Sequence, residues 1–243
     1  PTPSVYDLFG SAVSTAGDNV LVSAISDNTG GVGSGAVYLF DADPQSPTFG
    51  NLLHTFLNPT PSFGDRFGLA VSAVGGNILV SAPDDDTGAA GSASGTVYFF
   101  DADPQSPTFG SLIHTFLNPT PANSGFYDDN FGQSIAVMGH NVLIGAPNDY
   151  TADFQAGAVY LFNADPRSPT FGALLHTFLS PSHTSGFGYS ITVVGNNMLV
   201  GAPLYDFPVQ DSGAAYLFDA DLQSPTFGER LKAFYNPTPQ QLG

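Results

Sequence analysis

The chain has 243 residues and a formal net charge of −17, with four basic residues against 21 acidic ones. This balance argues against nucleic acid as a partner, because a nucleic-acid-binding protein neutralises phosphates with Lys and Arg. An anionic membrane surface is disfavoured for the same reason. There is no Cys, and no stretch is apolar and long enough to cross a bilayer, so we expect neither disulfides nor membrane insertion.

A fourfold repeat organises the sequence. Phe-Gly pairs recur about every 60 residues, at Phe9, Phe67, Phe131 and Phe187. A repeat of this length is one supersecondary unit that buries its apolar faces against its neighbours. We therefore predict one all-β domain over 1–243. Its four units are expected at about 5–62, 63–125, 126–182 and 183–239.

The second repeat shows the strands expected in every unit. A first strand is expected over 68–74, where small and apolar residues mix. A second follows over 78–82, an apolar run that Pro83 ends because proline cannot donate to a β-ladder. Two more are expected over 96–100, which is rich in β-branched and aromatic residues, and over 112–117.

Four antiparallel strands with small residues in the first are typical of a β-propeller blade. The sequence therefore predicts a β-propeller of four blades. A closed four-bladed ring is the favoured arrangement. Part of a larger ring, a ring shared by two chains, or an open arc that stacks head to tail remain alternatives.

Two dipeptides that recur in the repeats, Phe-Gly and Ala-Pro, carry a family resemblance. Ala-Pro follows Phe-Gly at the same spacing in three repeats, in the segments 80–83, 144–147 and 200–203, whereas Ile25 replaces proline in the first. This pattern resembles the FG-GAP repeats of integrin α-subunit propellers. The resemblance implies an extracellular or cell-surface protein that binds partners and does not catalyse reactions.

The calcium loop of that family is not carried over. Many FG-GAP blades hold calcium between their first two strands, in a loop rich in Asp. Here the corresponding segments are short turns, at 16–19, 75–77, 139–141 and 195–197. They hold too few carboxylates for a cation that takes six to eight oxygen ligands.

Acidic residues gather instead in the loops between the second and third strands, which a propeller places on one rim. The candidate metal ligands are Asp27, Asp84, Asp85, Asp86, Asp149, Asp153, Asp206 and Asp211. Calcium is the cofactor that such oxygen clusters favour. The alternative interpretation is a solvated acidic rim that keeps the protein soluble.

Other repeated polar residues have structural interpretations. The Asp-Ala-Asp-Pro turns, such as 101–104, are interpreted as turns in which Asp accepts backbone hydrogen bonds. His54, His114 and His176 share one register on the fourth strand and are interpreted as surface residues. No catalytic triad can be assembled with confidence, so we do not expect an enzyme.

Aromatic residues give two of the rim loops a binding character. The candidate ligand-binding residues are Phe126, Tyr127, Tyr150, Phe154, Tyr205 and Phe207. Aromatic side chains beside acidic ones suit sugar stacking or a protein hot spot. We therefore predict a secreted or cell-surface binding or adhesion module, cation-dependent if the acidic loops hold calcium, with a protein or carbohydrate partner. The alternative is a structural surface or filament protein that self-associates head to tail.

Overall fold

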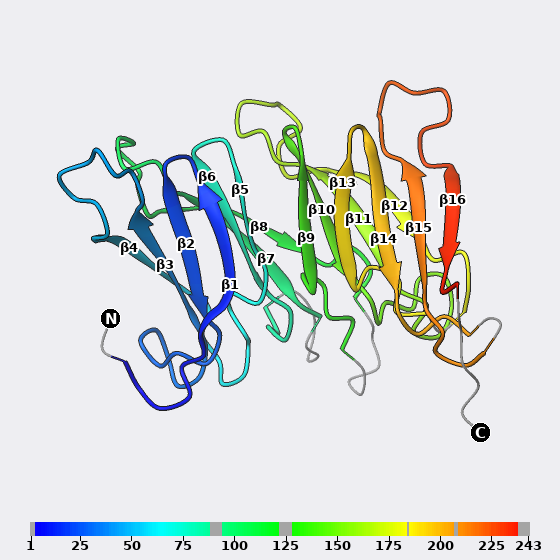
Figure 1. Ribbon diagram of the computed structural model, residues 1–243, viewed down its shortest axis with the longest axis horizontal. Helices are drawn as coiled ribbons and strands as arrows, with labels where there is room; N and C mark the ends of the chain where they lie inside the picture. The colour runs from blue at the N-terminus through cyan, green and yellow to red at the C-terminus, as the bar shows by residue number, and fades with distance from the viewer. Residues whose placement is uncertain (1–2, 88–93, 122–127, 184, 207–208, 238–243) are drawn as a thin grey trace. The chain divides into compact units, whose positions relative to one another are not determined.

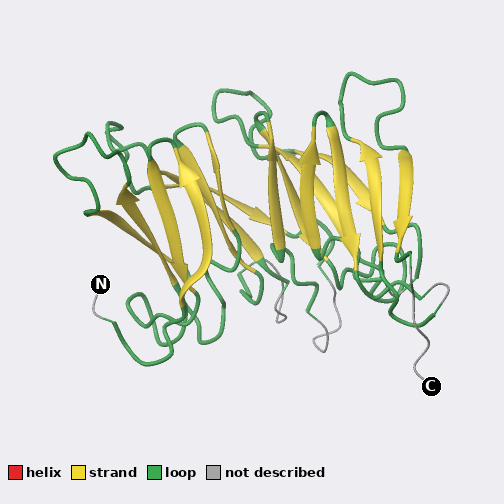
Figure 2. Cartoon of the chain, in the orientation of Figure 1, coloured by secondary structure: helices red, strands yellow, loops and turns green. Residues whose placement is uncertain are grey.

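The computed structural model describes residues 3–87, 94–121, 128–183, 185–206 and 209–237. All of their regular secondary structure is β-strand (Figure 2). None of these residues belongs to a helix long and apolar enough to cross a membrane. The Phe126 and Tyr127 side chains and that of Phe207, all predicted to bind a ligand, lie outside the described residues.

The strands form four separate antiparallel sheets of four, each a meander in chain order. The first holds β1 (Phe9–Ala16), β2 (Asn19–Ala24), β3 (Ala36–Asp41) and β4 (Leu52–Leu57). The second holds β5 (Val71–Val74), β6 (Asn77–Ala82), β7 (Thr96–Asp101) and β8 (Leu112–Leu117). The third holds β9 (Ser134–Met138), β10 (Asn141–Ala146), β11 (Ala158–Asn163) and β12 (Leu174–Leu179), and the fourth holds β13 (Ser190–Val194), β14 (Asn197–Ala202), β15 (Ala214–Asp219) and β16 (Arg230–Tyr235).

These sheets are the blades of the predicted β-propeller, and we call them blades one to four. Contacts divide the chain into two compact units, Pro1–Asn118 and Pro119–Gly243. Within the first unit, blades one and two meet along β1 and β5, and within the second, blades three and four meet along β9 and β13 (Figure 1). Each sheet falls inside one predicted repeat; that 1–243 form one domain stays a prediction.

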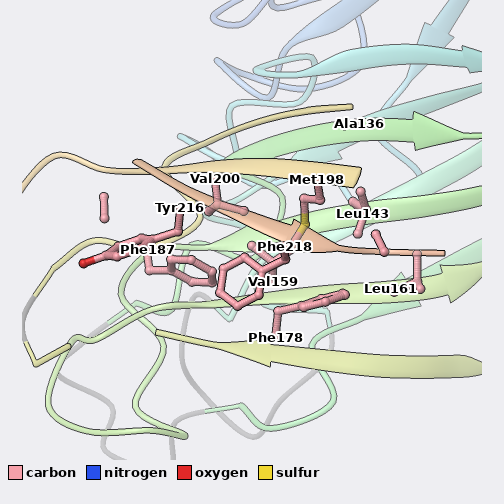
Figure 3. Close-up of a cluster of buried hydrophobic side chains, with 12 residues drawn as sticks. Ala136, Leu143, Val159, Leu161, Phe178, Phe187, Met198, Val200, Tyr216 and Phe218 are labelled. Atoms are coloured by element: carbon pink, nitrogen blue, oxygen red, sulfur yellow. The ribbon is translucent and has the colours of Figure 1, made fainter. Parts of the chain in front are cut away.

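Apolar side chains from both blades of a unit share one core. In the second unit, Leu161 and Phe178 of blade three pack in one buried cluster with Phe187, Val200 and Phe218 of blade four (Figure 3). A middle strand of a blade is therefore apolar on both faces, because one face meets the neighbouring blade. Burial of this kind is the main favourable contribution to the stability of each unit.

The Phe-Gly pair marks the place where one blade meets the one before it. Phe67 is fully buried, and its N–H donates to the carbonyl of Ser34 at 3.1 Å. Gly68 has φ +97°, and a Cβ on it would lie 2.8 Å from Cβ of Ser23 and 3.0 Å from Cγ2 of Val37. Only glycine combines this backbone conformation with so close an approach.

The Asp-Ala-Asp-Pro turns are structural, as predicted. Asp101 accepts hydrogen bonds from the N–H of Asp103 at 3.1 Å and from the hydroxyl of Thr108 at 2.6 Å, and it also accepts the hydroxyl of Ser106. Burial raises the pKa of Asp101, but these hydrogen bonds lower it by more, so the pKa stays below its usual value.

The fourth-strand histidines, interpreted from the sequence as surface residues, are half-buried, and two of them pack against the next blade. The imidazole of His54 lies 5.1 Å from the ring of Phe109 in the next blade, and that of His176 lies 4.8 Å from the ring of Phe227. Burial lowers the pKa of both histidines. They pack between blades as neutral aromatic rings.

Candidate functional site

In blades one to three, one aspartate of the loop between the second and third strands is buried and paired with a tyrosine. The Tyr98 hydroxyl donates to Asp85 at 2.7 Å, and the N–H of Thr87 donates to the other carboxylate oxygen at 2.7 Å. Tyr160 donates to Asp149 in the same way, at 2.6 Å. The carboxylate oxygens of these aspartates already accept hydrogen bonds from the protein. The aspartates therefore hold the conformation of the loop that follows each second strand.

Blade one repeats the pair with Asp27 and Tyr38, whose hydroxyl donates at 2.5 Å. Burial opposes ionisation of Asp27, but the hydrogen bonds from Thr29 and Tyr38 outweigh it and lower the pKa of this carboxyl. Burial and the same carboxylate raise the pKa of Tyr38 to about 12. The pair therefore consists of an ionised aspartate that accepts the hydrogen bond and a neutral phenol that donates it.

The connection between blades one and two adds a second buried carboxylate to this network. The side-chain amide of Asn58 donates to Asp65 at 2.7 Å and to Asp85 at 3.3 Å. The Thr60 hydroxyl lies 2.7 Å from the Tyr98 hydroxyl. Burial, reinforced by the charge of Asp85, raises the pKa of Asp65 to about 6. The network ties the connection to the blade that follows it.

The remaining predicted metal ligands are dispersed. Arg66 forms an ion pair with Asp84, while His183 pairs with Asp153. Asp86 is exposed. In blade four, Asp206 accepts the N–H of Asp211 at 2.9 Å. Among the described residues, no group of three or more His, Cys, Asp or Glu side chains is placed to hold a metal ion.

These surroundings do not fit calcium. A calcium site presents oxygen lone pairs to the cation, whereas Asp85 is surrounded by the N–H of Thr87, the amide of Asn58 and the hydroxyl of Tyr98. Donor hydrogens at these positions would repel a cation. Calcium binding by the rim loops stays a prediction from the sequence, and the function proposed below does not depend on it.

Blade four departs from the pattern of the other three. Tyr205 stands where they have the buried aspartate, while Ser180 and Ser185 replace the counterparts of Asn58 and Asp65. The Ser180 and Ser185 hydroxyls lie 2.8 Å apart. A charged network has thus become a neutral one in this blade.

The tyrosine that replaces aspartate joins an aromatic cluster. The Tyr205 ring stacks on the Tyr235 ring, with centroids 5.5 Å apart, and meets the Tyr216 ring edge-on at 6.2 Å. The Arg230 guanidinium lies 5.9 Å from the Tyr216 centroid, within the range of a cation–π interaction. Tyr235 and the neighbouring Leu204 are exposed, so part of the cluster faces solvent.

A second aromatic pair lies on blade three. The rings of Tyr150 and Phe154 meet edge-on with centroids 5.4 Å apart, and Phe154 is exposed. The connection to blade four links the two clusters. Its His183 pairs with Asp153 beside Phe154, and the carbonyl of its Ser185 accepts the N–H of Leu204 at 3.0 Å. We call the resulting surface the aromatic rim: Tyr150, Phe154, His183, Leu204, Tyr205 and Tyr235.

Three of these six, namely Tyr150, Phe154 and Tyr205, were predicted from the sequence to bind a ligand, and that role stays a prediction. Sequence reasoning missed His183, Leu204 and Tyr235. A signal for Tyr235 was present, because the other three repeats have leucine at its position, at Leu57, Leu117 and Leu179. Comparison of each repeat with the other three would have found it.

Two depressions lie at the turns between first and second strands. One of about 380 Å³ is lined in part by His140, Asn196 and Asp221, and one of about 190 Å³ by Asp18, Asn19 and Asp103. Within the larger, the Asn196 amide already donates to Asp221 at 2.9 Å. The sequence singled out neither as a site.

Comparisons with known proteins agree with the repeat pattern. The FG-GAP repeat family matches four times, at residues 3–40, 61–100, 122–162 and 182–218, together more than half of the chain. No curated protein matches. Similar solved structures include the computationally designed Ika4 protein, at 14% identity over 79% of this chain and 84% of that one, with a TM-score of 0.47.

A chain of the Mitotic Checkpoint Complex is similar over 93% of this chain and 51% of its own length, at 13% identity and a TM-score of 0.55. At this identity the likeness concerns the fold alone. Each of the four in-phase family matches covers the first three strands of one sheet, to within one residue. The chain belongs to the FG-GAP repeat family.

Proposed function

We propose that this propeller-type module is a non-catalytic binding or adhesion protein of the cell surface or the extracellular space, and that the aromatic rim is its ligand-binding surface. One observation carries the proposal. Blade four replaces the buried structural aspartate with Tyr205, which stacks on the exposed Tyr235. Blades one to three use that position to hold their own loop.

The composition of the rim supports a protein ligand. Tyr and Arg are the residues most enriched in interface hot spots, because they bury a large area and still offer a polar group. Tyr235 presents an exposed ring, and Arg230 approaches the same cluster through Tyr216. The equivalent loop of blade two offers Asp86 and Thr87 instead. Blade two therefore has no aromatic ring at the position that Tyr205 occupies in blade four.

Family membership supports the location and the absence of catalysis. FG-GAP repeats resemble the propellers of integrin α-subunits, which act outside the cell by binding partners. The acidic composition is compatible with a rim that meets a neutral or cationic surface. A carbohydrate is the other partner that aromatic rings suit, and the experiment below separates it from a protein.

The test is a binding assay of the purified chain against immobilised collagen, immobilised fibronectin and a glycan array. We expect saturable binding to a protein probe, weakened about tenfold or more by Tyr235→Ala, the size of effect expected for a hot-spot ring. Tyr189→Ala is the matched control, because Tyr189 is similarly exposed outside the rim. Binding only to glycans would replace the protein ligand with a carbohydrate. Equal loss in both variants, or no binding to any probe, would refute the proposal.

A further inference from the structure

We infer that the depression between the turns of blades three and four binds one saccharide unit, a neutral ligand rich in hydroxyl groups. The depression has a volume of about 380 Å³, and all of its lining residues belong to the second unit. Its Asn196 directly precedes β14, whereas Tyr205 of the aromatic rim follows that strand. The two surfaces therefore lie at opposite ends of β14, and the inference is independent of the ligand proposed above.

Five polar side chains from three turns line this depression. The turn between β9 and β10 contributes His140 and Asn141, the turn between β13 and β14 contributes Asn196, and the turn after β15 contributes Asp221 and Gln223. No Lys or Arg is among the described residues that line it. Segments far apart in the sequence thus bring one carboxylate, three amides and one imidazole to the same place.

Hydrogen bonds hold these turns in position. The N–H of Ala220 donates to the carbonyl of Asn196 at 3.2 Å. The carboxylate of Asp221 accepts the N–H of Gln223 at 2.9 Å and the side-chain amide of Asn196 at 2.9 Å. Because the polar groups are held before a ligand arrives, binding costs less conformational entropy.

The depression is shaped by residues in which blade four departs from the other repeats. Asn196 stands where blade two has Gly76, and Leu222 stands where each of the other three repeats has proline. A Cβ on Gly76 would lie 3.2 Å from Cβ of Asp103, so a side chain at this position reaches the aspartate of the next turn, as that of Asn196 does. Blade two forms the same four-stranded sheet without these residues, so the sheet does not require them.

The first unit has the corresponding depression in a different form. It lies at the turns of blades one and two, has a volume of about 190 Å³, and is lined in part by Asp18 and Asp103. These residues correspond to His140 and Asp221 of the second unit. Two carboxylates in about half the volume leave less room and fewer donors for a hydroxyl-rich ligand. We therefore expect the saccharide only in the second unit.

The mixture of donors and acceptors favours a neutral ligand with many hydroxyl groups. Each hydroxyl both donates and accepts, as do the amides of Asn196 and Gln223 and a neutral imidazole. A metal cation requires acceptors alone, whereas these amides also present donor hydrogens. An anion would lie beside the carboxylate of Asp221 in a protein with a net charge of −17.

Apolar side chains complete the lining. Ala220 is fully buried, Met138 is half-buried and Leu222 is 41% exposed. Small-molecule sites combine such an apolar surface with a few oriented polar groups, in volumes of roughly 300–1,000 Å³. One face of a sugar ring presents C–H groups that can pack on this surface. A depression near the lower end of that range suits one sugar ring.

NMR titration of the isotope-labelled full chain with free glucose, galactose, mannose and N-acetylglucosamine tests the inference. We expect at least one sugar to shift the N–H signals of Gly139, Asn196 and Gln223 in a saturable way. Asn196→Gly and Leu222→Pro, which give blade four the residues of other repeats, should each weaken that sugar about threefold or more, as for the loss of a neutral hydrogen bond or of apolar contact. Asp18→Asn, in the smaller depression, is the control and should leave the affinity unchanged.

Circular dichroism identifies any variant that fails to fold, and the two substitutions of blade four test the site separately. No saturable shift with any of the four sugars would overturn the inference, as would equal weakening by the control. Shifts confined to the aromatic rim would also overturn it, and they would instead favour a carbohydrate as the ligand of that rim. Spermidine serves as a cationic probe. If spermidine shifts the three signals and no sugar does, the depression binds a cation and the inference is wrong.

Discussion

The Tyr98 hydroxyl donates a hydrogen bond to Asp85 across 2.7 Å, and both side chains are buried. The aspartate comes from the loop after β6 and the tyrosine from β7, so the bond closes that loop over its own blade. The same relationship holds Asp27 to Tyr38 and Asp149 to Tyr160. The loops that the sequence suggested for metal binding are thus organised by phenol–carboxylate pairs.

Removing the phenol should weaken the fold without unfolding it. Tyr98→Phe deletes one donor to Asp85, which keeps the Thr87 N–H and the Asn58 amide. We expect a loss of about 1–2 kcal/mol in the free energy of unfolding, measured by urea denaturation. Tyr189→Phe, at an exposed site, should change it by less than about 0.5 kcal/mol. Equal effects of the two substitutions would show that the buried bond contributes nothing.

Asp65 should make the stability depend on pH. Its pKa in the folded protein, about 6, lies above the ordinary value of 3.8. Between these values the folded state binds more protons than the unfolded state, so stability falls as pH rises through that range and stays lower above it. The free energy of unfolding lost as pH rises across the whole range is roughly 3 kcal/mol. Asp65→Asn should remove this contribution, as measured by denaturation at pH values on either side. A variant with the same pH dependence as the natural chain would contradict the assignment.

The Phe-Gly pair offers a matched test of blade contact. Gly68 and Gly10 have nearly the same φ, +97° and +94°, but a Cβ on Gly10 meets no atom within 4 Å. At low protein concentration, Gly10→Ala should cost only the backbone strain, about 1 kcal/mol. Gly68→Ala adds a collision with Ser23 and Val37, and we expect a further loss of about 1–3 kcal/mol. Equal losses in thermal melts would mean that the neighbouring blade moves aside without cost.

Calcium should leave the melting temperature unchanged. The donors around Asp85 and the ion pair of Arg66 with Asp84 already occupy these carboxylates. A specific ion present at about 100 times its Kd would stabilise the fold by about 2.7 kcal/mol. Thermal melts with calcium and with EDTA should therefore coincide. A saturable rise in the midpoint with calcium would restore the metal interpretation of the rim.

Much of the fold could be predicted from local pattern. The second repeat was expected to have strands over 78–82 and 112–117, and the structure has β6 at Asn77–Ala82 and β8 at Leu112–Leu117. Proline, turn residues and apolar runs mark such boundaries within a few residues of sequence. The Phe-Gly and Ala-Pro spacing likewise indicated the family, and Phe67 and Gly68 show a physical reason for the Phe-Gly pair, because both lie where blade two meets blade one.

The site depended on contacts that no local pattern contains. Asn58 reaches Asp85 from the preceding blade, and His54 packs on Phe109 of the following one. A run such as Asp84-Asp85-Asp86 looks like a cation site until its donors are known. Only packing shows that one of these three is buried, one pairs with arginine and one is exposed.

The central claim is that blade four exchanged a structural aspartate for a binding tyrosine. Tyr205→Asp restores the residue that blades one to three carry at this position and removes the ring that stacks on Tyr235. The direct measurement is the affinity of this variant for the protein probe that binds the natural chain, with its thermal melt recorded in parallel. We predict that affinity falls about tenfold or more while the fold is retained. Unchanged affinity in a folded Tyr205→Asp variant would contradict the account.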